Sequence, residues 1–202
     1  MIKAIFFDFS GVIATNKLED QIVAFAKKAK VNAEKLTILE KENHDKMMLG
    51  KLSVKEFCSS VRSRFALKQD SMDLLLLWDK CYSENVRINT ELLEKIKELK
   101  KMCKIGLVAN MFDTTAQFHQ RQNIFFYFKP LVISCRVGLK KPESEILQRA
   151  VALTGEVKAS ECLIIDDKEE DLVVAKKIGI KTLKYENNKK LFKDLKKLKL
   201  LK

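Results

Sequence analysis

The chain has 202 residues, of which 47% are apolar and 33% are charged, and its formal net charge is +12. This length predicts one domain of ordinary size, with or without an inserted subdomain. The apolar share excludes a disordered protein, and two prolines and six glycines exclude a fibrous or linker-rich one. No run approaches the roughly 18 apolar residues of a membrane helix, and no signal peptide is visible. Five cysteines, odd in number and without a Cys-x-x-Cys pair, indicate reduced thiols, so we expect a cytoplasmic protein that does not enter membranes.

Most of the positive charge gathers near the C-terminus. Residues 181–202 contain nine lysines against two carboxylates, and Leu191, Leu195 and Leu198 recur there at helical spacing. A helix docked by this leucine face, with its lysines in solvent, accounts for the segment. Only six of the 39 basic residues are arginine, the residue that base readout and bidentate phosphate contacts favour. We therefore favour a solvated helical face over a nucleic-acid surface.

The first segment predicts a buried strand. Residues 2–8 form a nearly continuous apolar run that ends at Asp8, and residues 9–12 have the composition of a turn. A strand covered on both faces, as in a parallel sheet, has this pattern. Asp8 would then lie at the carboxyl end of the strand, where open α/β sheets bind ligands.

Residues 16–85 predict only helices. Gly50 stops one helix, and Ser53 with Glu56 has the spacing of a capping box at the start of the next. Asp70 or Ser71 can cap a further helix. We therefore expect an all-helical insert. Its apolar positions at helical spacing include Leu18, Ile22, Phe25, Ala29, Phe57, Val61 and Phe65.

The remainder of the chain alternates between helix and strand, which predicts a parallel sheet covered by helices on both faces, an α/β fold. Because the insert separates the first strand from the others, we expect residues 1–15 and 86–202 to form the α/β core and residues 16–85 to form a separate unit. The expected strands are 105–109, 131–134, 162–165 and 181–183, and the expected helices are 90–102, 115–122, 143–153 and 169–178.

Four features of the sequence fall at strand ends in this scheme: Asp8 after the first strand, the Ala109–Asn110 pair after the next, Lys141 before a helix, and the aspartates from Asp166 onward after a further strand. Because parallel strands share one carboxyl edge, we expect these residues to converge. Clustered carboxylates repel one another unless a cation lies among them, and oxygen ligands suit Mg²⁺. A lysine nearby would balance a carboxylate nucleophile and hold an anionic substrate. The residues concerned are Asp8, Ala109, Asn110, Lys141, Asp166, Asp167 and Asp171.

Each of these features also has a purely structural explanation. Asp8 could form a turn, Asp166 and Asp167 could cap the helix that follows them, and Lys141 could lie on the surface. Their order and spacing together favour a site.

Three motifs in this order resemble the haloacid dehalogenase-like hydrolases. Residues 6–13 (FFDFSGVI) are similar to the first motif of that family, residues 137–143 (VGLKKPE) to its lysine motif, and residues 164–171 (IIDDKEED) to its acidic metal motif. The insert lies where this family carries a helical cap, and residues 50–57 resemble a recurrent cap sequence. The resemblance implies a Rossmann-like core with an inserted helical cap. The branch it resembles contains small sugar phosphatases and the N-terminal domains of soluble epoxide hydrolases.

By this resemblance, Asp8 is the nucleophile that takes up a phosphoryl group. Mg²⁺ would be held by Asp8, Asp167 and the backbone carbonyl of Ser10, with Asp166 and Asp171 as ligands or supports. Lys141 would pair with Asp8 and the phosphate, and backbone N–H groups after the first strand and at Asn110 would complete a phosphate cradle.

Two positions depart from the family pattern. Ser10 replaces the aspartate that normally protonates the leaving alcohol and then activates water, help worth about 10²–10⁴-fold. Ala109 replaces a serine or threonine hydroxyl that binds phosphate, a loss of about 1.5–3 kcal/mol. Family members without that aspartate, including dehalogenases, still catalyse hydrolysis.

We therefore predict a Mg²⁺-dependent hydrolase that acts on a small phosphorylated metabolite and is slow because of Ser10. Two alternatives remain: a 2-haloacid dehalogenase in which Asp8 attacks carbon without a metal, and a non-catalytic binding protein. The acidic cluster argues against the first alternative. Specificity is expected on the cap, and the sequence does not determine the substrate or the oligomeric state. The expected specificity positions are Asn16, Lys17, His44, Met47 and Met48.

Overall fold

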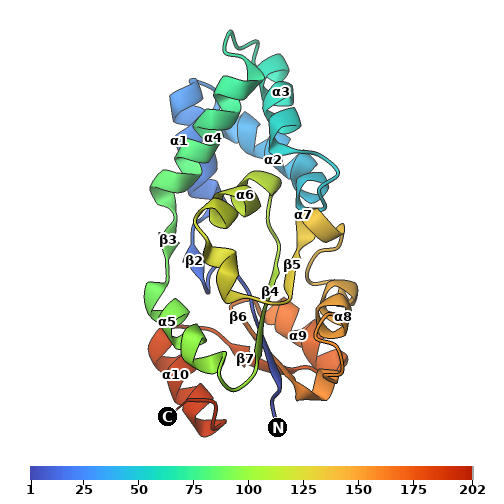
Figure 1. Ribbon diagram of the computed structural model, residues 1–202. Helices are drawn as coiled ribbons and strands as arrows, with labels where there is room; N and C mark the ends of the chain where they lie inside the picture. The colour runs from blue at the N-terminus through green and yellow to red at the C-terminus, as the bar shows by residue number, and fades with distance from the viewer. Residues whose placement is uncertain (202) are drawn as a thin grey trace.

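A computed structural model describes residues 1–201 and contains a five-stranded sheet with the order β5-β4-β1-β6-β7 (Figure 1). Each neighbouring pair is parallel, which confirms the predicted α/β fold. The first strand in sequence lies at the centre, between two strands that both follow the helical insert in the chain. The strands are β1 (Ala4–Phe7), β4 (Lys104–Ala109), β5 (Leu131–Ile133), β6 (Cys162–Asp166) and β7 (Lys181–Lys184).

The central strand β1 is buried on both faces, as its apolar run predicts. Ile5 and Phe7 belong to one hydrophobic cluster, which includes residues of α5, α6 and α10, whereas Ala4 and Phe6 belong to another, which includes residues of α8 and α9. Alternate side chains of a strand point to opposite faces, so helices cover the sheet on both sides (Figure 1). These helices are α5 (Thr90–Leu99), α6 (Asp113–Arg121), α8 (Ser144–Ala152), α9 (Glu169–Lys177) and α10 (Asn188–Lys197).

The segment between β1 and α5 is helical, as predicted, and packs around a hydrophobic cluster of its own (Figure 1). Phe25, Phe57 and Trp78 form its centre, with ring centroids 5.4 and 5.6 Å from Trp78. Ser53 and Glu56 form the predicted capping box, and Asp70 accepts hydrogen bonds from two backbone N–H groups at the start of α4. The helices are α1 (Leu18–Ala29), α2 (Ala33–Met48), α3 (Val54–Arg64) and α4 (Ser71–Asn85).

Several short elements were not predicted. An antiparallel ribbon of β2 (Ala14–Thr15) and β3 (Arg87–Ile88) lies where the helical segment leaves and rejoins the sheet. Two-residue strands carry too little periodicity to be recognised. The other unpredicted elements are the 3₁₀ helices η1 (Ile124–Tyr127) and η2 (Ala159–Glu161) and the one-turn helix α7 (Ser134–Val137).

The C-terminal helix α10 docks by its leucine face, as predicted, but the prediction is wrong for one of the three leucines. Leu191 and Leu195 are buried, whereas Leu198 is 44% exposed. The helix ends at Lys197, and Lys199 adopts the left-handed conformation, so the chain turns and buries Leu200 instead.

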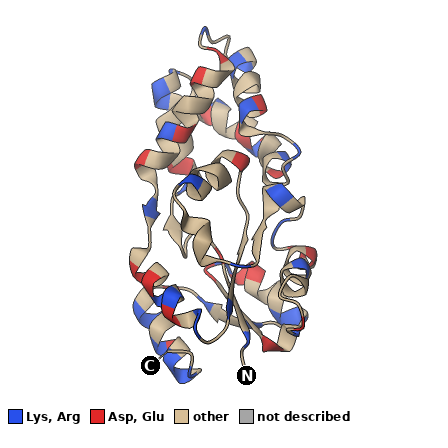
Figure 2. Ribbon diagram, viewed as in Figure 1, with Lys and Arg blue, Asp and Glu red and all other residues tan. Residues whose placement is uncertain are grey.

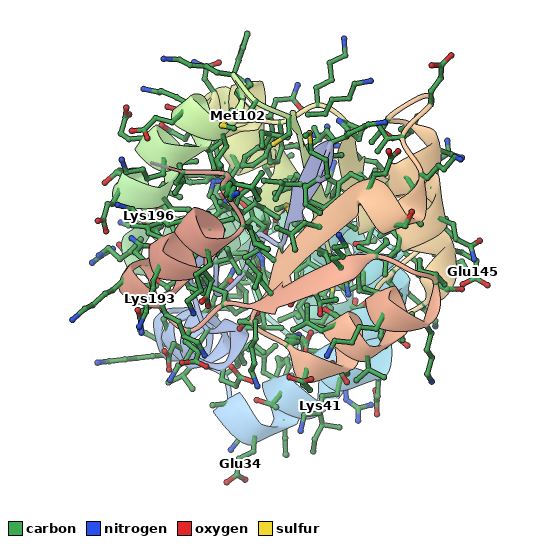
Figure 3. The ribbon with its side chains drawn as sticks, turned by 90° about the horizontal axis from the view of Figure 1, so that it is seen from below. Glu34, Lys41, Met102, Glu145, Lys193 and Lys196 are labelled. Atoms are coloured by element: carbon green, nitrogen blue, oxygen red, sulfur yellow. The ribbon has the colours of Figure 1, made fainter. Side chains whose placement is uncertain are left out.

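The lysines of α10 face away from the sheet. Lysine and arginine cover its outer side in Figure 2, and Lys193 and Lys196 point outward in Figure 3. Lys190 and Lys197 pair with Glu186 and Asp194 on the same surface. Among residues 1–201, no helix is both long enough and apolar enough to cross a membrane.

Candidate active site

The carboxyl ends of β1 and β6 bring three aspartates together. Asp8 directly follows β1, Asp166 is the last residue of β6, and Asp167 follows it. The Asp8 backbone N–H donates to the carbonyl of Ile165 at 2.9 Å, which holds the two strand ends side by side. One carboxylate oxygen from each aspartate lies within 4.8 Å of the others. The sequence predicted this convergence of Asp8 and Asp167.

Lys141 lies in the middle of the acidic residues, with its side chain only 3% exposed. Its Nζ is 2.8 Å from Asp8 Oδ1 and 3.0 Å from Asp171 Oδ2, and it also pairs with Asp166 Oδ2. The preceding residue, Lys140, points elsewhere and pairs with Asp45 of α2 at 2.6 Å. The predicted contact between Lys141 and Asp8 is therefore present. Lys141, and not its neighbour Lys140, is the lysine that reaches Asp8.

The electrostatics of the cluster leave an excess of negative charge. Burial raises the pKa of Asp8 to about 7, and the Lys141 ammonium only partly opposes this effect. Burial also raises the pKa of Asp167 and of Asp171. For Lys141, burial acts to lower the pKa, but the three surrounding carboxylates outweigh it and hold the pKa above its ordinary value. One ammonium thus faces several carboxylates, an arrangement that a further cation would stabilise.

The residues present fit a divalent cation. Asp167 Oδ1 is buried and has no hydrogen-bond partner among the residues that the structure describes. Gly11 allows Asp167 to approach, because a Cβ at that glycine would lie 2.3 Å from Asp167 Oδ2. Carboxylate oxygens are the ligands that Mg²⁺ prefers. Asp8, Asp166 and Asp167 therefore form the candidate cation site.

Asp171 is not one of these three side chains, although the family resemblance implied that it binds Mg²⁺ or supports the residues that do. Its carboxylate instead contacts the Lys141 ammonium. The structure thus assigns it the supporting position.

Asn110 fixes the backbone on which Lys141 is carried. Its Nδ2 donates to the carbonyl of Lys141 at 2.9 Å, and its Oδ1 accepts from the Lys141 N–H at 2.9 Å. Both polar atoms of the Asn110 side chain therefore form hydrogen bonds with the Lys141 backbone. Ala109, the last residue of β4, is fully buried and offers no side-chain donor.

Ser10 is exposed at the mouth of a small hollow of about 80 Å³ between the core and the helical segment. Of the specificity positions expected from the sequence, Asn16 and Met48 line it. Met47 is buried in the interior of the helical segment, and Lys17 is exposed. The complete lining is Ser10, Ala14, Asn16, Leu18, Gln21, Met48, Tyr82, Asn110, Met111, Phe112 and Thr115.

The sequence did not identify Gln21, Tyr82 or Phe112 as site residues. Phe112 follows β4, yet its ring lies 6.5 Å from Trp78 and 5.5 Å from His44, inside the helical segment. Apolar and amide side chains are common on helix faces, so their type alone carries no functional signal. Only the packing of the helical segment against the loop after β4 places them together.

The helical segment is packed down onto the sheet edge. The Val54 N–H at the start of α3 donates to Asp113 Oδ1 of α6 at 3.2 Å. Gly50 lies so near α7 that a Cβ there would be 2.1 Å from the carbonyl oxygen of Cys135. The segment therefore covers the hollow that Ser10 and Asn110 line.

The structure thus combines a parallel sheet, acidic residues and a buried lysine at its carboxyl edge, and an inserted helical segment packed onto that edge. The chain belongs to the haloacid dehalogenase-like hydrolases, whose sequence profile matches residues 2–179. This membership confirms the resemblance seen in the motifs and establishes the class of enzyme.

Similar proteins come from several organisms. The chain is 26% identical to a D-ribitol-5-phosphate phosphatase of Bacteroides thetaiotaomicron over 93% of both chains. It superposes on a haloacid dehalogenase family enzyme of that bacterium, crystallised with magnesium and inorganic phosphate, with a TM-score of 0.77 and 20% identity over 95% of this chain and 100% of that one. The TM-score to a 2-haloacid dehalogenase of Pseudomonas syringae is 0.66 at 20% identity, covering 92% and 86% of the two chains.

Proposed function

We propose that this protein is a Mg²⁺-dependent phosphatase that acts on a small phosphate ester, with Asp8 as the nucleophile. The observation that carries this proposal is the buried contact of Lys141 Nζ with Asp8 Oδ1, made beside the carboxylates of Asp166 and Asp167. The similarity to a sugar-alcohol phosphatase and to an enzyme that binds magnesium and phosphate supports the choice of phosphate over other leaving groups.

In this mechanism Asp8 attacks phosphorus, the bond from phosphorus to the ester oxygen breaks, and an aspartyl phosphate forms. The leaving alkoxide takes up a proton from solvent water. A second water then attacks phosphorus, the bond from phosphorus to the Asp8 oxygen breaks, and inorganic phosphate and free Asp8 result. Mg²⁺ held by Asp8, Asp167 and the Ser10 carbonyl, with Asp166 in support, would supply positive charge against the phosphate oxygens. Lys141 orients Asp8 and balances its charge, while Asn110 holds Lys141 in place.

We propose that both proton transfers are slow. The Ser10 hydroxyl has too high a pKa to act as general acid or base, and general acid–base help is worth about 10²–10⁴-fold. Ala109 also lacks the hydroxyl that would donate to the phosphate. Esters whose leaving group needs no proton, such as nitrophenyl phosphate, should therefore react best.

Residues 16–85 are proposed to act as a cap on a core of residues 1–15 and 86–202. The β2–β3 ribbon is the double connection between the two parts and is suited to act as a hinge. With the helical segment packed down, the hollow beside Ser10 holds only about 80 Å³, so a substrate must be small or must enter while the cap is open.

A binding protein without turnover is the second candidate, because Ser10 and Ala109 remove two groups on which catalysis depends. A dehalogenase is disfavoured, because attack on carbon has no use for the cation site formed by Asp8, Asp166 and Asp167.

The test is phosphate release from nitrophenyl phosphate with Mg²⁺ and with EDTA, for the wild-type protein and for Asp8→Asn. We expect weak turnover that requires Mg²⁺ and is abolished in the variant. Halide release without metal from a 2-haloacid would support the dehalogenase. Thermal stabilisation by phosphate esters without any turnover would support the binding protein.

A further inference from the structure

Two of the three amide side chains that line the hollow, Asn16 and Gln21, lie where the chain passes from the β2–β3 ribbon into the helical segment. Gln21 on α1 is almost completely buried, with 2% of its surface exposed. Its Nε2 donates to the backbone carbonyl of Trp78 at 3.3 Å. Asn16 precedes the same helix, and its Nδ2 lies 3.5 Å from Gln21 Oε1.

These contacts fix which way each amide points. The Trp78 carbonyl can only accept a hydrogen bond, so it must face the NH₂ group of Gln21. The carbonyl oxygen of Gln21 then faces Asn16 and can only accept, so Asn16 must turn its own NH₂ group toward Gln21. The remaining atom, Asn16 Oδ1, is buried and has no donor among residues 1–201.

An unpaired buried acceptor is costly, so its persistence calls for a donor that arrives with a ligand. We propose that Asn16 Oδ1 accepts a hydrogen bond from a hydroxyl group of the substrate and so selects hydroxylated phosphate esters. This inference rests on the proposed function and names the substrate class of that site. Asn16 and Ser10 line the same hollow, and Ser10 follows Asp8 by two residues, so a substrate whose phosphate lies at Asp8 would extend past Ser10 toward Asn16.

The surroundings favour a neutral donor over a cationic one. Within the described part of the chain, residues 1–201, no carboxylate lines the hollow, and the side chains that do are amides, hydroxyls, methionines, aromatic rings and the aliphatic Ala14 and Leu18. An ammonium group would therefore be desolvated without a counter-charge, whereas a hydroxyl can be satisfied by the Asn16 carbonyl oxygen alone. A sugar alcohol or sugar phosphate meets this requirement, and an amine does not.

The experiment compares two esters of equal length, ribitol 5-phosphate and pentyl phosphate, in wild type and in Asn16→Leu. The ratio of their kcat/KM values isolates the contribution of the hydroxyl groups. We expect wild type to prefer ribitol 5-phosphate and Asn16→Leu to reduce that preference by about tenfold or more, mainly through KM. The matched control is Thr15→Val, the neighbouring ribbon residue, which does not line the hollow and should leave the ratio unchanged.

A second measurement does not depend on turnover. In the Asp8→Asn background with Mg²⁺, ribitol 5-phosphate should raise Tm more than pentyl phosphate does, and Asn16→Leu should remove the difference. Equal stabilisation by the two esters in the parent protein overturns the inference, whether or not the wild type hydrolyses them. An equal loss with both esters in Asn16→Leu also overturns it, because a merely structural role would affect both alike. Failure of the proposed function would appear separately, as absence of Mg²⁺-dependent phosphate release from any ester.

Discussion

The Asn110 side chain and the Lys141 backbone form two hydrogen bonds in opposite directions, each 2.9 Å long. The pair joins the end of β4 to the loop before α8, and it sets the position from which the Lys141 ammonium reaches Asp8. We therefore propose that Asn110 acts on the chemistry through Lys141, as a positioning residue.

We expect Asn110→Ala to lower kcat by roughly 10- to 100-fold with nitrophenyl phosphate, because small displacements of a catalytic group have effects of this size. Asn110→Asp keeps the acceptor for the Lys141 N–H but places a carboxylate against the Lys141 carbonyl, so it should be impaired as well. Steady-state kinetics at saturating Mg²⁺ measure the effect. Unchanged kcat in a folded Asn110→Ala protein would contradict the positioning role.

Lys141→Met should strongly destabilise the fold. It leaves Asp8, Asp166 and Asp171 buried without their cation, and loss of one partner from a buried ion pair costs about 3–5 kcal/mol. Lys140→Met is the matched control, because the Lys140–Asp45 pair is largely exposed on the Asp45 side and is worth about 0–1 kcal/mol. Urea unfolding in EDTA measures both. Equal losses would show that Lys141 has no special electrostatic role.

Gly11→Ala should weaken Mg²⁺ binding by about tenfold or more, the size of effect seen when support of metal ligands is lost. The new methyl group would lie 2.3 Å from Asp167 Oδ2 and would displace that carboxylate. Calorimetric titration with Mg²⁺ gives the affinity.

Gly155→Ala separates this contact from backbone strain. Gly155 has φ +80°, close to the +89° of Gly11, but nothing lies within 4 Å of its would-be Cβ. Both variants should lose about 1–2 kcal/mol of stability from the left-handed conformation, and only Gly11→Ala should lose Mg²⁺ affinity. Equal Mg²⁺ affinities of the two variants would show that Asp167 does not belong to the cation site.

Ser10→Asp should raise turnover of alkyl phosphates by about 10²-fold or more, because it supplies a carboxylate for general acid–base catalysis. Nitrophenyl phosphate should gain less in the first step, since its leaving group needs no proton. Wild type should also show a burst of about one equivalent of nitrophenolate if hydrolysis of the aspartyl phosphate is slow. Fast turnover of alkyl phosphates by wild type, with no gain in Ser10→Asp, would mean that another residue supplies the proton.

His119 should destabilise the fold in mild acid, in opposition to Asp8, whose raised pKa acts the other way. The His119 side chain is buried among the rings of Phe9 and Phe118, and its Nε2 forms a 2.5 Å hydrogen bond with the Tyr82 hydroxyl. Burial lowers the pKa of His119 to about 4, below its ordinary 6.5. At His119 the unfolded chain therefore binds a proton before the native state does, so the stability that this residue contributes is complete above pH 6.5 and falls as the pH drops toward 4.

The expected loss from His119 over this range is at most about 3 kcal/mol. His119→Gln can still hydrogen-bond Tyr82 but does not titrate, and Asp8 titrates in both proteins, so the urea midpoint of wild type should fall relative to that of His119→Gln between pH 7 and pH 5. Parallel curves for the two proteins would exclude His119 as the source of the acid sensitivity.

The sequence by itself determined the features that depend on residues close together in the chain. The apolar run before Asp8 predicted a buried strand, Ser53 and Glu56 predicted a helix start, and the alternation after residue 90 predicted the parallel sheet. Strand and helix periodicity and capping are local properties, so they are visible without a fold. The shared edge of a parallel sheet then extended the prediction to the meeting of Asp8, Lys141 and Asp167.

Only the tertiary structure decided which atoms meet across long stretches of chain. Lys141 contacts Asp8 across 133 residues, whereas its neighbour Lys140 pairs with Asp45. Asp171 contacts the Lys141 ammonium and lies outside the group formed by Asp8, Asp166 and Asp167. Likewise, the unpaired oxygen of Asn16 follows from the Gln21 hydrogen bond to Trp78, 57 residues away. Such relationships depend on how helices and loops pack onto the sheet, and packing is set by the whole chain rather than by any local pattern.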